Sequence, residues 1–232
     1  MIASMSRLIH RSCGFLWILP PMLLLISSCT TPAVYNVDIL YIPTEAEREM
    51  MPHKTAVPPV TVALFQDVRD REDPIVVGAV LPDAEREKPR PVLPKYKKPP
   101  QALVNAIGDF LTRQGYAVSG SHPDWDLTED TIDGSWGEVL LGGTIEELFI
   151  ECDRSGIINK YRARAGVTIV LADIKTKRIL YRVSAASNPS RDDIRFSEIM
   201  MEREINRALS SAIEKAFAES ALLSHIDAMS GM

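Results

Sequence analysis

Three stretches in the second half of the chain read EVLLGGTIEELFIE (residues 138–151), KYRARAGVTIVLADI (160–174) and RILYRVS (178–184). Each is rich in apolar and β-branched residues and is bounded by polar or glycine residues, which is typical of strands. The short polar segment 175–177 predicts a turn that joins the last two stretches as a hairpin. Gly142-Gly143 predicts a bulge or bend in the first stretch. The sequence therefore predicts an antiparallel meander.

Two helices are predicted beside this meander. Residues 101–114 place apolar side chains on one helical face, and a second apolar stripe follows a Ser197 cap and the staple residue Phe196. The first stripe is Leu103, Val104, Ile107, Phe110 and Leu111, and the second is Met201, Ile205, Leu209, Ile213 and Phe217. Residues 60–65 (VTVALF) predict a strand covered on both faces. We expect an α/β (α+β) two-layer sandwich, with a mixed, mostly antiparallel sheet and two main helices packed on one face.

The first 28 residues have the character of a targeting signal. Arg7 and Arg11 precede an apolar run of 12 residues, 15–26, which as a helix spans about 18 Å and is short for a bilayer core of about 30 Å. Ile26-Ser27-Ser28-Cys29 resembles a bacterial lipobox. The resemblance implies cleavage before Cys29, a diacylglycerol and an N-acyl chain on it, and no other cofactor. Thr30, in place of an aspartate, implies the outer membrane with the body facing the periplasm. A plain cleaved signal and an uncleaved anchor are the alternatives.

These features predict the domain organisation. After the signal peptide 1–28, residues 29–59 are a lipidated tether with a short strand at 35–41. Residues 60–223 form a single α/β domain, and 224–232 are a frayed tail. Six prolines within residues 81–100 predict a long exposed excursion from this domain.

Composition narrows the class of protein. The chain of 232 residues is 46% hydrophobic and 25% charged, which is ordinary for a globular protein. Its net charge of −5 becomes −7 without the signal peptide, which carries two arginines and no acidic residue. A negative balance argues against a dedicated nucleic-acid binder.

The order of elements resembles the YajG-type family of uncharacterised bacterial lipoproteins. The residues that carry the resemblance are the lipobox at Cys29, Val60–Arg71, Gly78, Gly115-Tyr116, Trp125-Asp126 and Gly143-Thr144-Ile145. More distantly, the chain resembles the α/β domain of the TolB N-terminal part and of penicillin-binding-protein activator lipoproteins. The resemblance implies this fold over roughly Tyr35–Phe217 and no activity assignable to particular residues.

Two groups of charged residues are candidate sites. Asp67 and Arg69, at the end of the first strong strand, are a strand-end site or a solvated turn in which the arginine pairs locally. The proline-rich excursion carries a basic cluster that is a partner-binding element or a solubilising loop. This cluster consists of Lys88, Arg90, Lys95, Tyr96, Lys97 and Lys98.

We expect no metal site, no catalytic residues and no enzyme activity. The acidic loop 124–133 does not have the EF-hand spacing, because Thr128 and Glu129 stand at its fifth and sixth positions. Cys152 is expected to be a buried bystander, and no P-loop, nucleophile elbow or dinucleotide fingerprint occurs. The predicted function is a lipid-anchored envelope lipoprotein whose domain docks an envelope partner protein. The alternative is a ligand- or lipid-handling accessory of an envelope transport system, with an apolar cleft beside the sheet. The oligomeric state stays open.

Overall fold

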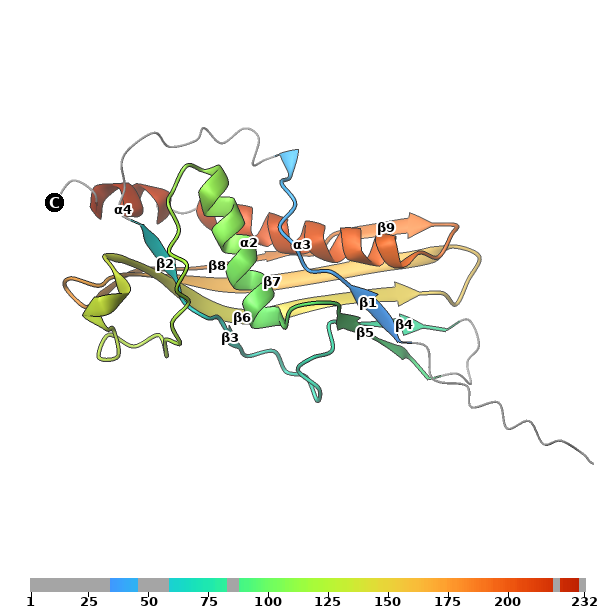
Figure 1. The fold of residues 1–232 in the computed structure, drawn as a ribbon. Coiled ribbons are helices and arrows are strands. Elements are labelled where there is room, and N and C mark those ends of the chain that lie inside the picture. Colours follow the sequence, from blue (N-terminus) through green and yellow to red (C-terminus); the bar gives the residue numbers. More distant parts are fainter. Residues whose placement is uncertain (1–33, 46–58, 83–87, 219–221, 230–232) are drawn as a thin grey trace, which may run out of the picture. The chain divides into compact units, whose positions relative to one another are not determined.

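The computed structural model describes residues 34–45, 59–82, 88–218 and 222–229 (Figure 1). Its elements are β1 (Tyr35–Val37), β2 (Val60–Val62), β3 (Gln66–Asp67), β4 (Gly78–Leu81), β5 (Arg90–Pro94), α2 (Pro99–Arg113), η1 (Gly134–Trp136), β6 (Val139–Asp153), β7 (Asn159–Asp173), β8 (Arg178–Ser187), β9 (Ser190–Asp193), α3 (Glu198–Ala218) and α4 (Leu222–Met229). The strands form one mixed, nine-stranded sheet in the order β1-β5-β4-β6-β7-β8, with β2 and β3 also paired to β6 and β9 to β7. The predicted fold class is confirmed.

The predicted meander is the centre of the sheet. β6 and β7, each of 15 residues, pair antiparallel from Val139 opposite Asp173 to Asp153 opposite Lys160. The bulge lies between Ile145 and Glu147 and not at the glycine pair. The two glycines instead make room for close neighbours. A Cβ on Gly142 would lie 2.6 Å from the Trp125 ring, and one on Gly143 would collide with the backbone carbonyl of Thr168 and lie 2.6 Å from the Phe65 ring.

Three short strands follow one another along the free edge of β6. β2, β3 and β4 each pair parallel with successive parts of it. The predicted strand 60–65 is therefore divided, because the chain leaves the ladder after β2 and rejoins it at β3. Val60 and Leu64 also form isolated bridges with Val118 and Asp124. The long strand β6 thus aligns several local segments that could not form a sheet by themselves.

The prediction of an exposed excursion over residues 81–100 is wrong for its second half. β5 lies inside the sheet, parallel to β1 and antiparallel to β4, although it contains Pro91 and Pro94. Lys95 donates its N–H to the carbonyl of Val37, so alternation along β5 directs residues 91, 93 and 95 toward β1. In the register, Pro94 lies opposite Val37 of β1 and Pro91 lies opposite Ala79 of β4. The nitrogen of each proline points away from the strand with which it is paired there, so neither proline removes a hydrogen bond of that ladder.

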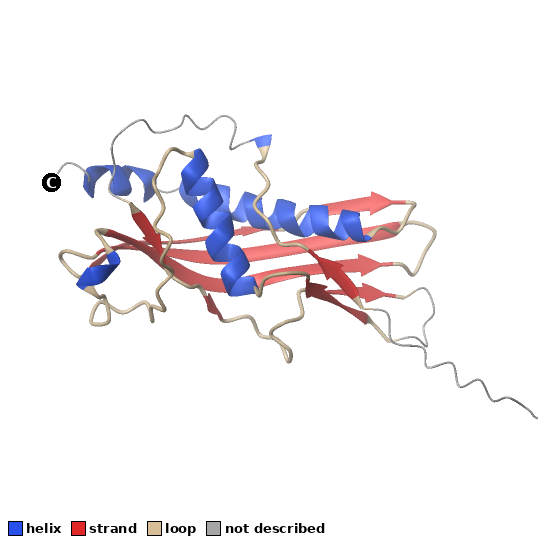
Figure 2. Ribbon diagram, viewed as in Figure 1, coloured by secondary structure: helices blue, strands red, loops and turns tan. Residues whose placement is uncertain are grey.

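The helices pack on one face of the sheet (Figure 2). Both predicted stripes are buried in one core, where the rings of Phe110 and Phe217 lie 4.6 Å apart. α4 adds Leu222 and Ile226 to the same core. None of the helices in the described part of the chain has an apolar run long enough to cross a bilayer.

A long loop covers one end of the opposite face. Trp125 and Ile132 pack there on Leu140 and Val170 in a second, smaller core. Asp126 in this loop accepts hydrogen bonds from the hydroxyls of Thr128 and Thr131, so its carboxylate organises the loop itself. In the described residues no group of three metal-ligating side chains comes together.

The predicted tether is part of the body over its described portion. Residues 34–45 run along α3, and Val37, Ile39 and Tyr41 are buried in the main core. The rest of the predicted tether, residues 29–33 and 46–58, lies outside the described residues. The predicted signal peptide and residues 83–87 of the predicted excursion also lie outside them. The domain therefore begins before residue 60.

Candidate functional site

One flank of α3 binds the segment that follows the lipobox in sequence. The backbone N–H groups of every second residue of this segment donate to side chains spaced four residues apart on α3, which we call the polar column. The pairs are Asn36 with Glu198 (3.3 Å), Asp38 with Glu202 (2.9 Å), Leu40 with Asn206 (3.0 Å), Ile42 with Ser210 (2.8 Å) and Thr44 with Glu214 (2.9 Å). Four helical residues rise about 6.0 Å, and two extended residues advance about 6.6 Å, so the two repeats stay in step.

Additional contacts close this arrangement at its centre and its end. The Nδ2 group of Asn206 donates to the carbonyl of Asp38 at 2.9 Å, so Asn206 holds the segment through both of its side-chain polar atoms. Glu214 also accepts from the hydroxyl groups of Tyr41, at 2.9 Å, and Thr44. Asn206, Ser210 and Glu214 are buried. Side-chain oxygens of α3 thus accept the backbone hydrogen bonds that the carbonyls of a neighbouring strand would accept in a sheet.

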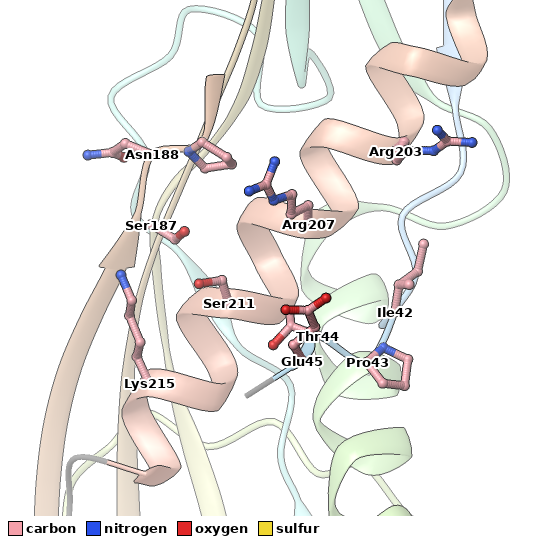
Figure 3. A pocket seen from close by; sticks show the side chains of 11 residues that line it. Ile42, Pro43, Thr44, Glu45, Ser187, Asn188, Arg203, Arg207, Ser211 and Lys215 are labelled. Atoms are coloured by element: carbon pink, nitrogen blue, oxygen red, sulfur yellow. The ribbon is translucent and has the colours of Figure 1, made fainter. Parts of the chain in front are cut away.

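A groove of about 780 Å³ lies beside this segment, between α3 and the β8–β9 turn. In Figure 3, Arg207, Ser211 and Lys215 lie on the side of α3 that faces Ser187 and Asn188. Arg203, also four residues from Arg207, lines the groove near Ile42. The acidic lining residue is Glu45. We call this the basic groove, because its cations outnumber its acid and would attract an anionic group.

The cations of the basic groove differ in their attachments. Lys215 Nζ donates to the carbonyl of Ala186 at 3.2 Å. Arg207 Nη1 lies 3.5 Å from Oε2 of Glu204, whose side chain is 1% exposed. Arg207 therefore stabilises the fold by neutralising a buried carboxylate, and Arg203 does not do so.

The predicted basic cluster is divided by the structure. Arg90 belongs to β5 and donates to the hydroxyl of Tyr35 at 3.5 Å, whereas Lys95–Lys98 form the turn into α2. Tyr96 is 69% exposed, and Lys95 Nζ lies 5.0 Å from its ring centre. The hydrogen bond to Tyr96 raises the pKa of Lys95 above its ordinary value. Lys88 directly follows residues 83–87, which lie outside the described part of the chain. What remains together is the exposed turn 95–98.

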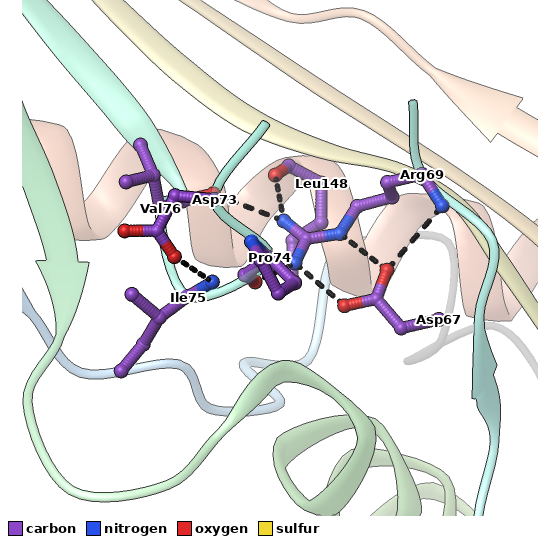
Figure 4. Close-up of polar contacts among 7 residues, drawn as sticks. All are labelled: Asp67, Arg69, Asp73, Pro74, Ile75, Val76 and Leu148. Carbon is purple, nitrogen blue, oxygen red and sulfur yellow. Dashed lines mark hydrogen bonds and ion pairs between the residues drawn. The ribbon is translucent and has the colours of Figure 1, made fainter. Parts of the chain in front are cut away.

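Asp67 and Arg69 do lie together, and their contacts are internal (Figure 4). Asp67 accepts from Nε and Nη2 of Arg69, both at 2.7 Å. The remaining guanidinium N–H groups donate to the carbonyls of Pro74, Val76 (3.2 Å) and Leu148 (3.1 Å). All five donors of Arg69 are engaged, and its side chain is 2% exposed. This supports the alternative of a locally paired turn, because no guanidinium donor remains for a ligand.

The remaining predicted positions are the two cysteines. Cys29 lies outside the described residues. Cys152 is a buried thiol on β6, and burial raises its pKa to about 11. A thiol with so high a pKa contains almost no thiolate at neutral pH, which supports the interpretation of a bystander.

The polar column was not predicted from the sequence. Its signal is nevertheless present, because Glu198, Glu202, Asn206, Ser210 and Glu214 recur every four residues beside the apolar stripe of the same helix. Such a repeat on one flank of a helix indicates a partner whose contact points recur at the spacing of four helical residues. Every second residue of an extended segment recurs at about that spacing.

Comparisons with known proteins identify a shared fold. No protein-family model matches the sequence, and no curated protein matches it. The crystal structure of protein XCC0632 from Xanthomonas campestris, family model DUF330, is similar with a TM-score of 0.53 and 8% identity, covering 84% of this chain and 99% of that one. A PelC dodecamer from Paraburkholderia phytofirmans has a TM-score of 0.36 and 14% identity, covering 72% of this chain and 91% of that one. The lipoprotein GNA1162 from Neisseria meningitidis has a TM-score of 0.37 and 10% identity, covering 70% of this chain and 99% of that one. The fold of this chain is thus shared with the Xanthomonas protein.

Proposed function

We propose that this protein is a non-catalytic lipoprotein of the bacterial cell envelope, anchored through lipid on Cys29, whose α/β body docks an envelope partner protein. The lipobox Ile26-Ser27-Ser28-Cys29 supports the anchor. The outer membrane, with the body facing the periplasm, is the proposed location, because Thr30 replaces the inner-membrane retention residue. A YajG-type family membership remains part of the same proposal.

The observation that carries the proposal is the polar column. It binds the chain from Asn36 onward, and only four residues lie between Cys29 and Val34. The five Cα–Cα steps from Cys29 to Val34 reach at most about 18 Å when fully extended. A lipid on Cys29 would therefore hold the folded body next to the bilayer and not on a long tether. Such a fixed distance is useful to a protein that must meet partners at the membrane.

The basic groove is the proposed docking surface. Arg203, Arg207 and Lys215 line a hollow large enough for an extended peptide segment, on a chain of negative net charge. A partner that presents an acidic segment fits this charge pattern. The predicted cluster at Lys95–Lys98 remains a second basic surface, although it forms a short turn and not a long loop.

The alternative, a ligand- or lipid-handling accessory, is less well supported. It predicts an apolar cleft beside the sheet. In the described residues the helix-covered face is filled by the main core, and the groove of about 780 Å³ beside α3 is lined by charged and polar side chains as well as apolar ones. Burial raises the pKa of Cys152 to about 11 and that of Tyr161 to about 12, so neither side chain is ionised at neutral pH.

The test combines lipid analysis with partner capture. The full-length protein is expressed in a bacterium, and the lipid mass on its N-terminal peptide is measured, with Cys29→Ala as the control. Envelopes are then crosslinked, and the co-purified proteins are identified by mass spectrometry. We expect a stoichiometric partner that is lost in an Arg203→Glu/Lys215→Glu variant and kept in a Lys175→Glu/Lys177→Glu variant, whose changes lie in the β7–β8 turn. An unmodified Cys29 would refute the anchor, and a lipidated protein without a partner would refute docking.

A further inference from the structure

Exposed isoleucines gather at one end of the sheet. Ile157, Ile194 and Ile199 are 91%, 76% and 68% exposed, and Ile158 beside them is also exposed. They come from the β6–β7 turn, the β9–α3 turn and the first turn of α3. The turns are neighbours because β9 pairs with β7, and Asn159 Nδ2 donates to the carbonyls of Asp193 and Ile194 at 3.2 and 3.0 Å. We call this surface the hairpin end.

The described N-terminal segment begins at the same end, with β1 (Figure 1). Tyr35 packs edge-on against Phe196 of the β9–α3 turn with ring centres 5.2 Å apart, and Asn36 binds Glu198 at the start of α3. Val34, the first described residue, is exposed. Arg154 of the β6–β7 turn lies 4.4 Å from the Phe196 ring. The attachment point and the exposed isoleucines thus share one surface.

Distances decide which end of the body can reach the bilayer. Four residues lie between Cys29 and Val34, and the five Cα–Cα steps that join these two residues span at most about 18 Å. The β7–β8 turn lies at the other end of β7, a strand of 15 residues that is about 50 Å long. A lipid on Cys29 therefore keeps the hairpin end within reach of the membrane, whereas the far turn lies about 50 Å away along β7. That far turn carries Lys175 and Lys177, whereas the near one carries Ile157 and Ile158.

The polar residues of the hairpin end suit a phospholipid surface. Arg191 and Arg195 are exposed and can contact phosphate groups. Two neighbouring acids are engaged within the protein, because Asp153 accepts from the Ser155 N–H and Asp193 from the Arg195 N–H, both at 3.0 Å. Asp192, next to Arg191, is also exposed. Large apolar side chains with arginines beside them are typical of amphipathic segments that contact the interface of a bilayer.

We propose that the hairpin end inserts Ile157, Ile194 and Ile199 into the leaflet that holds the Cys29 anchor, so that the body stands on the membrane through this end. The inference rests on the proposed lipid anchor and goes beyond it, since an anchored body could equally rotate freely above the bilayer. The occupant of this surface is lipid. Because the anchor already keeps this end adjacent to the bilayer, a small favourable free energy of transfer into lipid is enough to keep each isoleucine inserted.

The first experiment measures depth in the bilayer. Cys29 is blocked by its lipid, and Cys152 is buried. The cysteine of an Ile157→Cys or Ile194→Cys variant can therefore be labelled selectively with an environment-sensitive fluorophore. The lipidated protein is reconstituted in phosphatidylcholine vesicles that contain a doxyl-labelled lipid. We expect blue-shifted, quenched emission at both positions and water-like, unquenched emission at Lys175→Cys. Water-like emission at residues 157 and 194 in a protein with lipid on Cys29 would overturn the inference and leave the proposed function intact.

The second experiment separates insertion from anchoring. A secreted Cys29→Ala protein without lipid is mixed with vesicles of phosphatidylcholine and phosphatidylglycerol, and binding is measured by flotation. We expect weak binding that falls roughly tenfold for each of Ile157→Asp and Ile194→Asp. Val68→Asp, which replaces an exposed valine beside Ile145 in the middle of β6, should not change it. Equal binding of all variants, or concentration-dependent dimers through Ile157 without lipid, would overturn the inference. An N-terminal peptide without lipid would refute the proposed function separately.

Discussion

Replacement of Asn206 by leucine tests whether the polar column attaches the N-terminal segment. Asn206 is 1% exposed, accepts from the Leu40 N–H and donates to the Asp38 carbonyl. Asn206→Leu leaves both backbone groups without that partner, at a cost of about 1–3 kcal/mol each where water is excluded. These two bonds are only partly buried, so we expect the free energy of unfolding to fall by about 2 kcal/mol in total.

The assay must distinguish local detachment from general loss of stability. Urea unfolding gives the free energy, and hydrogen exchange followed residue by residue gives the location. We expect faster exchange at the amides of Asp38, Leu40 and Ile42, while the amides of β6 and β7 keep their protection. Arg203→Leu, which places the same side chain on an exposed position of α3, is the control. Unchanged exchange at Leu40 in Asn206→Leu would refute the reasoning, whatever happened to the global stability.

Three further predictions concern single side chains. Arg69→Leu should lower the free energy of unfolding by about 3–5 kcal/mol in urea titrations, because it leaves Asp67 and three carbonyls without their partner, and Arg69→Lys should rescue little, since an ammonium cannot meet five acceptors. Cys152, with its pKa raised to about 11, should resist a thiol reagent at pH 8 until denaturant is added, and rapid labelling of the native protein would contradict the burial described here. Hydrogen bonds from Thr131 and Thr128 lower the pKa of Asp126 below its ordinary value. The stabilisation from Asp126 is therefore present above its unfolded pKa and is lost as the pH falls through the lower folded value. Asp126→Asn should make stability less dependent on pH below about 4, and an identical acid profile would exclude the loop contacts as the cause.

The parts of the fold that could be predicted are those with a local signal. The meander of β6, β7 and β8 and the stripes of α2 and α3 follow from periodicity within one segment. The contact between Asp67 and Arg69 is local, because only one residue separates them in sequence.

The parts that could not be predicted depend on distant partners. Six prolines argued against a strand in residues 81–100, yet whether a proline interrupts a ladder depends on where the neighbouring strands begin. The segment 34–45 was interpreted as tether because its hydrogen-bond partners lie more than 160 residues away. The isoleucines of the hairpin end are scattered in sequence, and only the pairing of β9 with β7 brings them together.

The polar column also determines how the protein responds to mechanical force. The N-terminal segment runs in the same direction as α3, from Asn36 at Glu198 to Thr44 at Glu214. A pull on Val34 along the segment therefore loads its five backbone hydrogen bonds in shear at the same moment, and they must break together. A pull directed across the segment would instead break them one after another. The chain therefore resists tension best when that tension acts along the segment.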